Sequence, residues 1–233
     1  MQRSIHLKDF TVIDLTHDLT PEMPSWSGAC GFEHILREDY DPSAPVKFRT
    51  YDLHMQAGMG THMDAPAHCF LGGRSIADLR LNECIKPCVV INVSDQSHER
   101  YSLSPQDIKA FEAQHGLIPL GSFMIVYTGW DQHWNVPEKY RNNHVFPSIS
   151  KEAASLLLER QIVGVGIDTL SPDRPEDGFS VHHLILEADK YIIENIANAS
   201  KLPPVGAYTF ALPLKIQGGT EAPLRLIGLF REE

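Results

Sequence analysis

Short apolar runs rich in β-branched residues recur along the chain and are typical of buried strands. Most of these runs are too short for a helix, and Gly, Pro, Asn or Ser lies close to their ends. The predicted strands cover residues 11–15, 88–93, 123–127, 162–167, 191–194, 206–212 and 224–230. The pattern therefore predicts a fold with many strands, most of them buried.

Three segments between these strands carry apolar residues at helical spacing. Each follows a serine, which is a favoured N-cap because its hydroxyl accepts a hydrogen bond from a free backbone N–H group. The predicted helices cover residues 105–115, 151 to about 160 and 181–188, with Ser104, Ser150 and Ser180 as N-caps. The polar stretch 131–147 is predicted to be a loop. Helices alternating with buried strands predict one mixed α/β domain over residues 1–233, with strands outnumbering helices.

The charge balance narrows the classes of partner. The 233 residues include 20 Lys and Arg and 30 Asp and Glu, which gives a formal net charge of −10. This sign disfavours binding to a phosphate backbone, so we expect no nucleic-acid partner. No apolar run approaches the roughly 18 residues of a membrane-spanning helix, and residues 1–10 do not resemble a signal peptide. We therefore expect a cytoplasmic protein with no membrane segment.

The cysteines do not indicate a disulfide framework or a structural zinc site. A chain of this length without an export signal has no need of disulfides, so free thiols are expected. A structural zinc site needs four ligands, and no second pair follows Cys84 and Cys88 at a matching interval. The remaining cysteines are Cys30 and Cys69. Cys69 follows His68 directly but need not face it in space, and no Gly-x-Ser-x-Gly motif of a serine hydrolase is present.

The segment 58–68 contains three residues that could bind or serve a metal ion. In an extended backbone residues i and i+2 share a face, so His62 and Asp64 would point the same way. An imidazole together with a carboxylate suits zinc, manganese or iron. Pro66 interrupts the strand, which would leave His68 on a turn near the metal, where a general base belongs. The alternative is that Asp64 is an ordinary turn residue beside a proline.

A second group of candidate ligands lies near the end of the chain. His182 and His183 open the third predicted helix, and Glu194 ends the apolar run 191–194. An unpaired carboxylate is costly to bury, and a bound metal would remove that cost. The alternatives are that Glu194 pairs with Arg225 or lies at an exposed strand end, and that the histidines are surface residues.

The same residues resemble the hallmark of a known family. The metal-dependent cyclase-like hydrolases, which include bacterial kynurenine formamidase and isatin hydrolase, carry His-x-Gly-Thr-His-x-Asp-x-Pro-x-His. Residues 58–68 read Gly-Met-Gly-Thr-His-Met-Asp-Ala-Pro-Ala-His and lack only the first histidine. The resemblance continues in order through residues 13–15, 24–26, 165–173, His182, Glu194, Asn195, 212–219, Pro223 and Arg225. It therefore spans nearly the whole chain.

The resemblance implies a cyclase-like fold of the swivelling β/β/α type and a divalent zinc or manganese ion. It also implies a small-molecule substrate and hydrolysis of an amide carbon–nitrogen bond, linear or cyclic, as in the aryl formamide N-formylkynurenine. The metal ligands implied are His62, Asp64, His182 and Glu194. His68 would then donate and accept the proton, and Trp26 would line the substrate pocket, unless it only pins its loop. Family members associate, so a homodimer or homotetramer is expected.

Gly58 is the one departure from the motif. Glycine has no side chain to coordinate a metal, so we expect one ion rather than two. His54 and Gln56 precede Gly58 at intervals of two residues, and either could compensate if the strand is regular. The alternative function is a non-catalytic member that binds a metal or a small molecule. We expect Asp168, at the end of the strand 162–167, to cap a turn or orient a neighbour.

Overall fold

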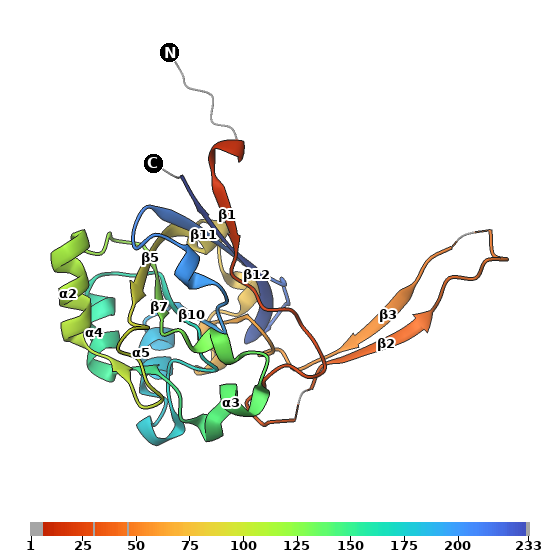
Figure 1. Ribbon diagram of the computed structural model, residues 1–233, viewed down its shortest axis with the longest axis horizontal. Helices are drawn as coiled ribbons and strands as arrows, with labels where there is room; N and C mark the ends of the chain where they lie inside the picture. The colour runs from red at the N-terminus through yellow and green to blue at the C-terminus, as the bar shows by residue number, and fades with distance from the viewer. Residues whose placement is uncertain (1–6, 30, 46, 232–233) are drawn as a thin grey trace, which may run out of the picture.

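A barrel forms the centre of the computed structural model, which describes residues 7–29, 31–45 and 47–231 (Figure 1). One sheet contains the strands β1 (Thr11–Asp14), β12 (Glu221–Phe230), β11 (Ala207–Pro213), β5 (Ile85–Asn92), β7 (Phe123–Tyr127), β9 (Gly164–Ile167), β10 (Tyr191–Glu194) and β4 (His62–Asp64), in that order. Strand β4 pairs with both β10 and β12, so every strand except β1 belongs to a closed ring. The first residues of β12 pair with β4 and its last residues pair with β1.

Half of the barrel is parallel and is built from three consecutive βαβ units. Strands β5, β7, β9 and β10 run parallel to one another. The connections between them contain α2 (Pro105–His115), α4 (Lys151–Glu159) and α5 (Ser180–Glu187), which cover the outer face of these strands (Figure 1). The predicted α/β fold with strands outnumbering helices is therefore confirmed.

The described residues form three hydrophobic clusters, of which the two largest lie inside the barrel and beneath the helices. Side chains alternate along each strand, so Met63 and Ile193 join the interior cluster, whereas Ile192 packs against α5. His62 and Asp64 flank Met63 and therefore face outward, on the same side as Ile192. Glycine is required at Gly166 of β9, because a Cβ atom there would overlap Ile196 in the interior.

Two of the three predicted helix caps are confirmed. The Ser104 hydroxyl accepts a hydrogen bond from the N–H of Asp107, and the Ser150 hydroxyl accepts one from Ala153. The prediction for Ser180 is wrong, because this residue lies within α5 and Phe179 precedes the helix with φ of 55°. The N–H groups of Val181 and His182 in the first turn of α5 instead donate to the carboxylate of Asp173, which lies in the loop just before the helix.

Several elements were not predicted from the apolar pattern. The expected loop 131–147 contains helical turns, namely Trp130–His133, α3 (Pro137–Arg141) and Asn142–His144. Short additions are α1 (Leu81–Cys84) and the paired strands β6 (Ser102–Leu103) and β8 (Ser148–Ile149). Single helical turns also cover Leu7–Asp9, Pro66–His68, Ile76–Asp78, Pro175–Asp177 and Ala199–Lys201. These elements are too short to show a helical or strand period.

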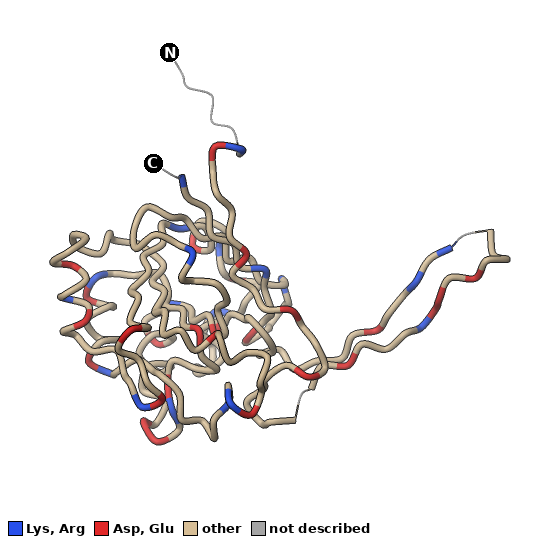
Figure 2. The backbone as a smooth tube through the Cα atoms, viewed as in Figure 1, with Lys and Arg blue, Asp and Glu red and all other residues tan. Residues whose placement is uncertain are grey.

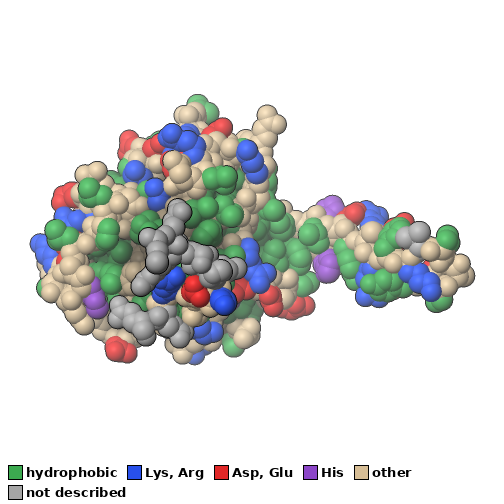
Figure 3. Space-filling model, turned by 90° about the horizontal axis from the view of Figure 1, so that it is seen from above, with side chains coloured by type: hydrophobic (Ala, Val, Ile, Leu, Met, Phe, Trp, Pro, Cys, Tyr) green, Lys and Arg blue, Asp and Glu red, His purple; other side chains and the backbone are tan. Residues whose placement is uncertain are grey.

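A β-hairpin projects from the barrel and is called the arm below. It consists of β2 (Glu33–Glu38) and β3 (Thr50–His54) and extends well beyond the rest of the molecule (Figures 1 and 3). Every residue of β2 is exposed. Acidic and basic residues lie along both strands of the arm (Figure 2), and Arg49 pairs with Asp39 across it at 2.7 Å. The arm therefore has no core of its own.

Two expectations from the sequence concern membrane-spanning helices and cysteines. Among residues 7–29, 31–45 and 47–231, no helix has the length and apolar character needed to cross a bilayer. Cys69, Cys84 and Cys88 are free thiols, and Cys84 and Cys88 are buried. The fourth cysteine, Cys30, lies outside the described residues.

Candidate metal centre

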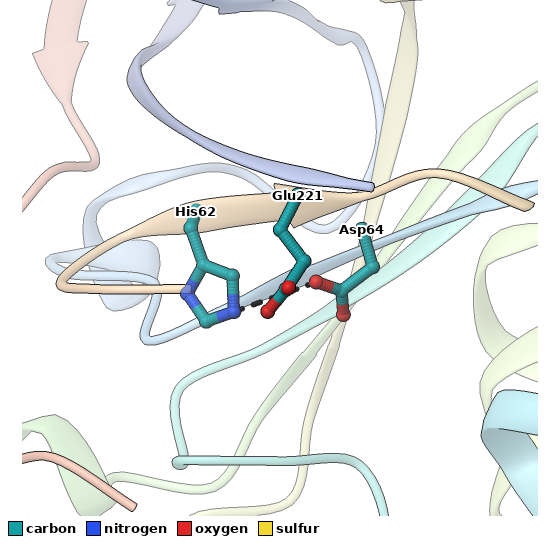
Figure 4. Close-up of side chains that lie close together, drawn as sticks. All are labelled: His62, Asp64 and Glu221. Atoms are coloured by element: carbon teal, nitrogen blue, oxygen red, sulfur yellow. Dashed lines mark ion pairs between the residues drawn. The ribbon is translucent and has the colours of Figure 1, made fainter. Parts of the chain in front are cut away.

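Three neighbouring strands bring polar side chains together on the outer face of the barrel. In the ladder between β4 and β10, His62 lies opposite Glu194. In the ladder between β4 and β12, Asp64 lies opposite Glu221. Residues opposite each other share a face, and so do residues i and i+2. Figure 4 shows the result, with His62, Asp64 and Glu221 pointing to the same side.

Helix α5 covers this face and contributes His182. Its ring is fixed by Asp173, whose Oδ2 lies 2.8 Å from His182 Nδ1 and accepts the His182 backbone N–H. The other ring nitrogen, Nε2, then lies 3.4 Å from Glu194 Oε1 and 3.6 Å from Asp64 Oδ2. A carboxylate behind an imidazole is the arrangement that orients histidine ligands in metal sites.

The donor atoms form two groups that share Asp64. One contains Asp64, His182 and Glu194, and the other contains His62, Asp64 and Glu221, with the donor atoms of each group within 4.8 Å of one another. Neither Asp64 oxygen has a hydrogen-bond partner, and the same holds for Glu194 Oε1, although all three atoms are buried. Burying such groups is costly unless a cation balances them, so the residues fit a divalent metal ion.

Glu194 does not pair with Arg225, which was the alternative from the sequence. Arg225 instead binds Asp14 with its Nε and Nη2 atoms, at 3.0 and 2.6 Å. Glu194 is buried and its Oε2 lies 3.3 Å from His62 Nε2. Its carboxylate therefore faces the imidazoles of the site rather than an arginine or solvent.

The electrostatics of the site favour positive charge. Burial lowers the pKa of His62, but the carboxylates of Asp64 and Glu194 outweigh burial and raise this pKa to about 9. Burial likewise lowers the pKa of His182, while Asp173, Asp64 and Glu194 raise it well above its ordinary value. These raised pKa values mean that the surrounding carboxylates favour protonated imidazoles when no metal is bound. A divalent cation would displace these protons.

His68 lies beside the two donor groups. It ends the helical turn Pro66–His68, so the turn that the sequence predicted after β4 is present. Its Nδ1 lies 3.3 Å from Glu221 Oε2, and its side chain is one-third exposed at 33 %. The hydrogen bond with Glu221 raises the pKa of His68. Next to it, burial raises the pKa of the Cys69 thiol, which opposes its use as a thiolate nucleophile.

A cavity of about 590 Å³ opens onto His62, His68, His182 and Glu194. This volume is within the range of small-molecule sites. Trp26 and Phe179 line the cavity, with ring centroids 5.9 Å apart. Trp26 also stacks on His144 at 4.1 Å, and its backbone oxygen lies 2.8 Å from His144 Nε2. The tryptophan is thus both held in place by His144 and available at the cavity wall.

Comparison with known proteins shows the family to which the chain belongs. A family model named Cyclase and described as "Putative cyclase" matches residues 13–174, which is more than half of the chain and includes β4 and His68. The chain belongs to the cyclase family.

Individual members of the cyclase family match over most of the chain. Isatin hydrolase of Roseibium aggregatum is 32% identical over 207 residues, which cover 82% of this chain and 78% of that protein. Kynurenine formamidase of Geobacillus thermodenitrificans is 29% identical over 91% of this chain and 94% of its own. The solved structure of isatin hydrolase A from Labrenzia aggregata bound to benzyl benzoate superposes with a TM-score of 0.87 and 29% identity, over 97% of this chain and 95% of that one.

The departure from the cyclase-family motif at Gly58 has a visible structural counterpart. Gly58 lines the cavity, and a Cβ atom there would overlap Glu221 Oε1. Gln56 also lines the cavity, whereas His54 ends β3 and is exposed. His54 does not belong to either of the two donor groups.

Sequence reasoning missed three residues of the site, Asp173, Phe179 and Glu221. Asp173 and Phe179 could have been noticed because they precede His182 within ten residues. Glu221 follows a Gly-Gly-Thr connection and reaches the site only through the pairing of β12 with β4. Asp168 is a structural residue, as expected, since its carboxylate accepts the N–H groups of Thr128 and Trp130.

Proposed function

We propose that this chain is a hydrolase that uses a divalent metal ion to cleave the carbon–nitrogen bond of an amide. The observation that carries the proposal is the set of buried, unpartnered oxygens on Asp64 and Glu194 beside His182 and an open cavity. Membership of the cyclase family and similarity to isatin hydrolase and kynurenine formamidase support the reaction class.

The metal ligands in this proposal are Asp64, His182 and Glu194, with His62 alongside Glu194. Imidazole and carboxylate donors suit zinc or manganese. A bound cation of this kind supplies Lewis acidity, which polarises the amide carbonyl and lets water react near neutral pH. Asp173 positions the His182 ring and makes it a better donor, because it accepts the proton on Nδ1.

His68 is the proton carrier in this proposal. It lies on the cavity wall beside the donor groups, and Glu221 holds its Nδ1. The opposite nitrogen, Nε2, is then free to accept a proton from the attacking water. Returned to the amide nitrogen, the same proton allows the amine to leave. A histidine is suited to both steps because its ordinary pKa lies near neutrality.

The walls of the cavity favour an aromatic amide as the substrate. Trp26 and Phe179 present ring surfaces, whereas His62, His182 and Glu194 form the polar end. A substrate with its ring between the aromatic residues would direct its amide toward the donor groups. Isatin, a cyclic amide, is the first candidate because isatin hydrolases are among the most similar proteins. N-formylkynurenine is the second candidate.

The test is a hydrolysis assay on protein stripped with a chelator and then reloaded with manganese or zinc. The proposal predicts no turnover of isatin or N-formylkynurenine after stripping and recovery of turnover on one of them after reloading. Reloaded protein that binds the metal but hydrolyses neither these compounds nor a panel of cyclic and aryl amides would support the alternative, a binding protein without catalysis. The missing motif histidine at Gly58 is the observation that favours this alternative.

We also propose that copies of the chain associate as a homodimer or homotetramer through the arm. Apolar side chains are exposed there, namely Ile35, Leu36, Tyr40, Phe48, Tyr51 and Leu53 (Figure 3). An isolated hairpin without a core gains stability when another surface covers it. Light scattering should give a dimer or tetramer for the wild type and smaller species for Leu36→Asp with Leu53→Asp. A monomeric wild type contradicts this proposal.

A further inference from the structure

Space rather than backbone conformation explains the glycine at position 58. The φ angle of Gly58 is outside the positive range that favours glycine, so its backbone would accept other residues. The obstacle is a side chain, because a Cβ atom on Gly58 would overlap Glu221 Oε1 and lie 3.3 Å from His62 Nε2. Glu221 therefore occupies the volume that a side chain at position 58 would need.

The Glu221 carboxylate is directed at the donor atoms of the site. Its Oε2 accepts a hydrogen bond from the Thr220 hydroxyl at 3.3 Å and lies 3.3 Å from His68 Nδ1. Its Oε1 faces Gly58. In Figure 4 the carboxylate lies between the His62 ring and the Asp64 carboxylate, and these three residues form one of the two donor groups.

The geometry of Asp64 supplies a separate indication of a cation at this position. Its side chain is only 2 % exposed, and both of its oxygens lack a hydrogen-bond partner. Oδ2 is directed toward His182 and Oδ1 toward His62, with distances of 3.6 and 3.5 Å to the Nε2 atoms. One cation beside His182 would engage Oδ2 and leave Oδ1 directed at the His62 ring without a hydrogen bond. A carboxylate with both oxygens free between two donor groups suits a bridge between two ions.

We propose that Glu221 takes the place of the side chain missing at Gly58, and that His62, Asp64 and Glu221 bind a second divalent cation that shares Asp64 with the first. The site replaces an imidazole with a carboxylate, which shifts its preference from zinc toward harder cations such as manganese. The proposal revises the expectation of one ion. It rests on the metal dependence proposed above and not on the reaction.

The experiment counts manganese in the full-length protein. Stripped protein is equilibrated with Mn²⁺, bound manganese per chain is measured by elemental analysis, and the EPR spectrum is recorded. The wild type should bind two ions per chain and give the exchange-coupled spectrum of ions about 3.5–4 Å apart. Glu221→Gln preserves the shape of the side chain and should bind one ion, with an uncoupled spectrum. Glu187→Gln, an exposed position on α5, is the control and should match the wild type.

A second variant, which adds a histidine at position 58, tests the proposal even if Glu221→Gln does not fold. Gly58→His alone requires the Glu221 carboxylate to move aside, whereas Gly58→His combined with Glu221→Ala removes this carboxylate and should bind two ions per chain. One ion per chain in the wild type, or two coupled ions in Glu221→Gln, would overturn the proposal. Two ions in a protein without any amidase activity would instead contradict the proposed reaction and leave the second site standing.

Discussion

The two sides of the barrel are stabilised by different means. Beneath α2 and α4, the outer faces of β5, β7 and β9 bury apolar side chains such as Val89, Met124 and Val165. Around β4, the outer face buries carboxylates and imidazoles, and three carboxylate oxygens have no hydrogen-bond partner. Apolar burial is favourable by itself, whereas buried charge needs a counter-ion. The difference indicates that the helical side stabilises the fold, whereas the β4 side carries the candidate metal centre.

The largest expected effect is on the β4 side, at His68. Removal of a general acid–base group costs about 10²–10⁴-fold in rate. His68→Ala should therefore lose activity on this scale while metal content stays at the wild-type level, because His68 lies outside both donor groups. Steady-state kinetics and elemental analysis on the same sample measure both quantities.

His183→Ala is the matched control for His68→Ala, since His183 lines the same cavity and also lies outside the donor groups. Its activity should stay close to that of the wild type. Equal losses of activity and metal in His68→Ala would identify His68 as a ligand and remove its separate role.

On the helical side, a cavity-forming substitution should lower stability without changing the chemistry. Leu157 on α4 is fully buried, and Leu→Ala changes of this kind cost about 2–5 kcal/mol. Leu157→Ala should lower the free energy of unfolding by this amount, as measured by chemical denaturation of the metal-loaded protein. Activity per folded molecule should be retained. A large loss of kcat in folded Leu157→Ala would show that the two sides are not separate.

Asp173 connects the two sides, because it caps α5 and holds His182. Residues that orient a metal ligand change metal affinity by about 10–100-fold. Asp173→Asn should weaken manganese or zinc binding on this scale, and excess metal should restore part of the activity. Asp177→Asn, on the same loop but paired with Arg174, is the control. Unchanged metal affinity in Asp173→Asn would contradict the positioning role.

The smallest expected effect is the pH dependence of the metal-free protein. The pKa of His62 is about 9 in the folded chain, against an ordinary value of 6.5, because Asp64 and Glu194 outweigh the effect of burial. A raised pKa stabilises the fold at pH values below 6.5, and this contribution is lost as the pH rises through about 9. The unfolding temperature of chelated protein should fall over this range, and His62→Gln should flatten the slope. An unfolding temperature that rises with pH would contradict the assigned charges.

The sequence predicted those parts of the fold whose residues carry their own pattern. Apolar runs such as 123–127 are long enough to mark buried strands, and the serines at positions 104 and 150 mark helix starts. The i, i+2 spacing of His62 and Asp64 predicted that both side chains lie on the same face of a strand, although β4 is only three residues long. The arm has no such pattern, since β2 is exposed along its whole length.

Contacts between distant segments could not be predicted in the same way. Glu221 reaches Asp64 only through the register of β12 on β4, and no local pattern specifies which residues of two separate strands lie opposite each other. Asp173 caps α5 only because of the path of the loop between them. The preference of serine for the N-cap position, which was the basis for predicting Ser180, carries no information about that path. The family motif therefore located most candidate ligands, but not the carboxylate that lies beside Gly58.

The central claim is that a divalent cation balances the buried carboxylates of the β4 side. Thermal unfolding of chelated protein, with and without added Mn²⁺, tests it directly in the wild type and in Asp64→Asn, which alters the residue shared by both donor groups. The account predicts that Mn²⁺ raises the unfolding temperature of the wild type and has little effect on Asp64→Asn. A wild type that does not respond to Mn²⁺ or Zn²⁺, or an Asp64→Asn variant that responds equally, would contradict the account.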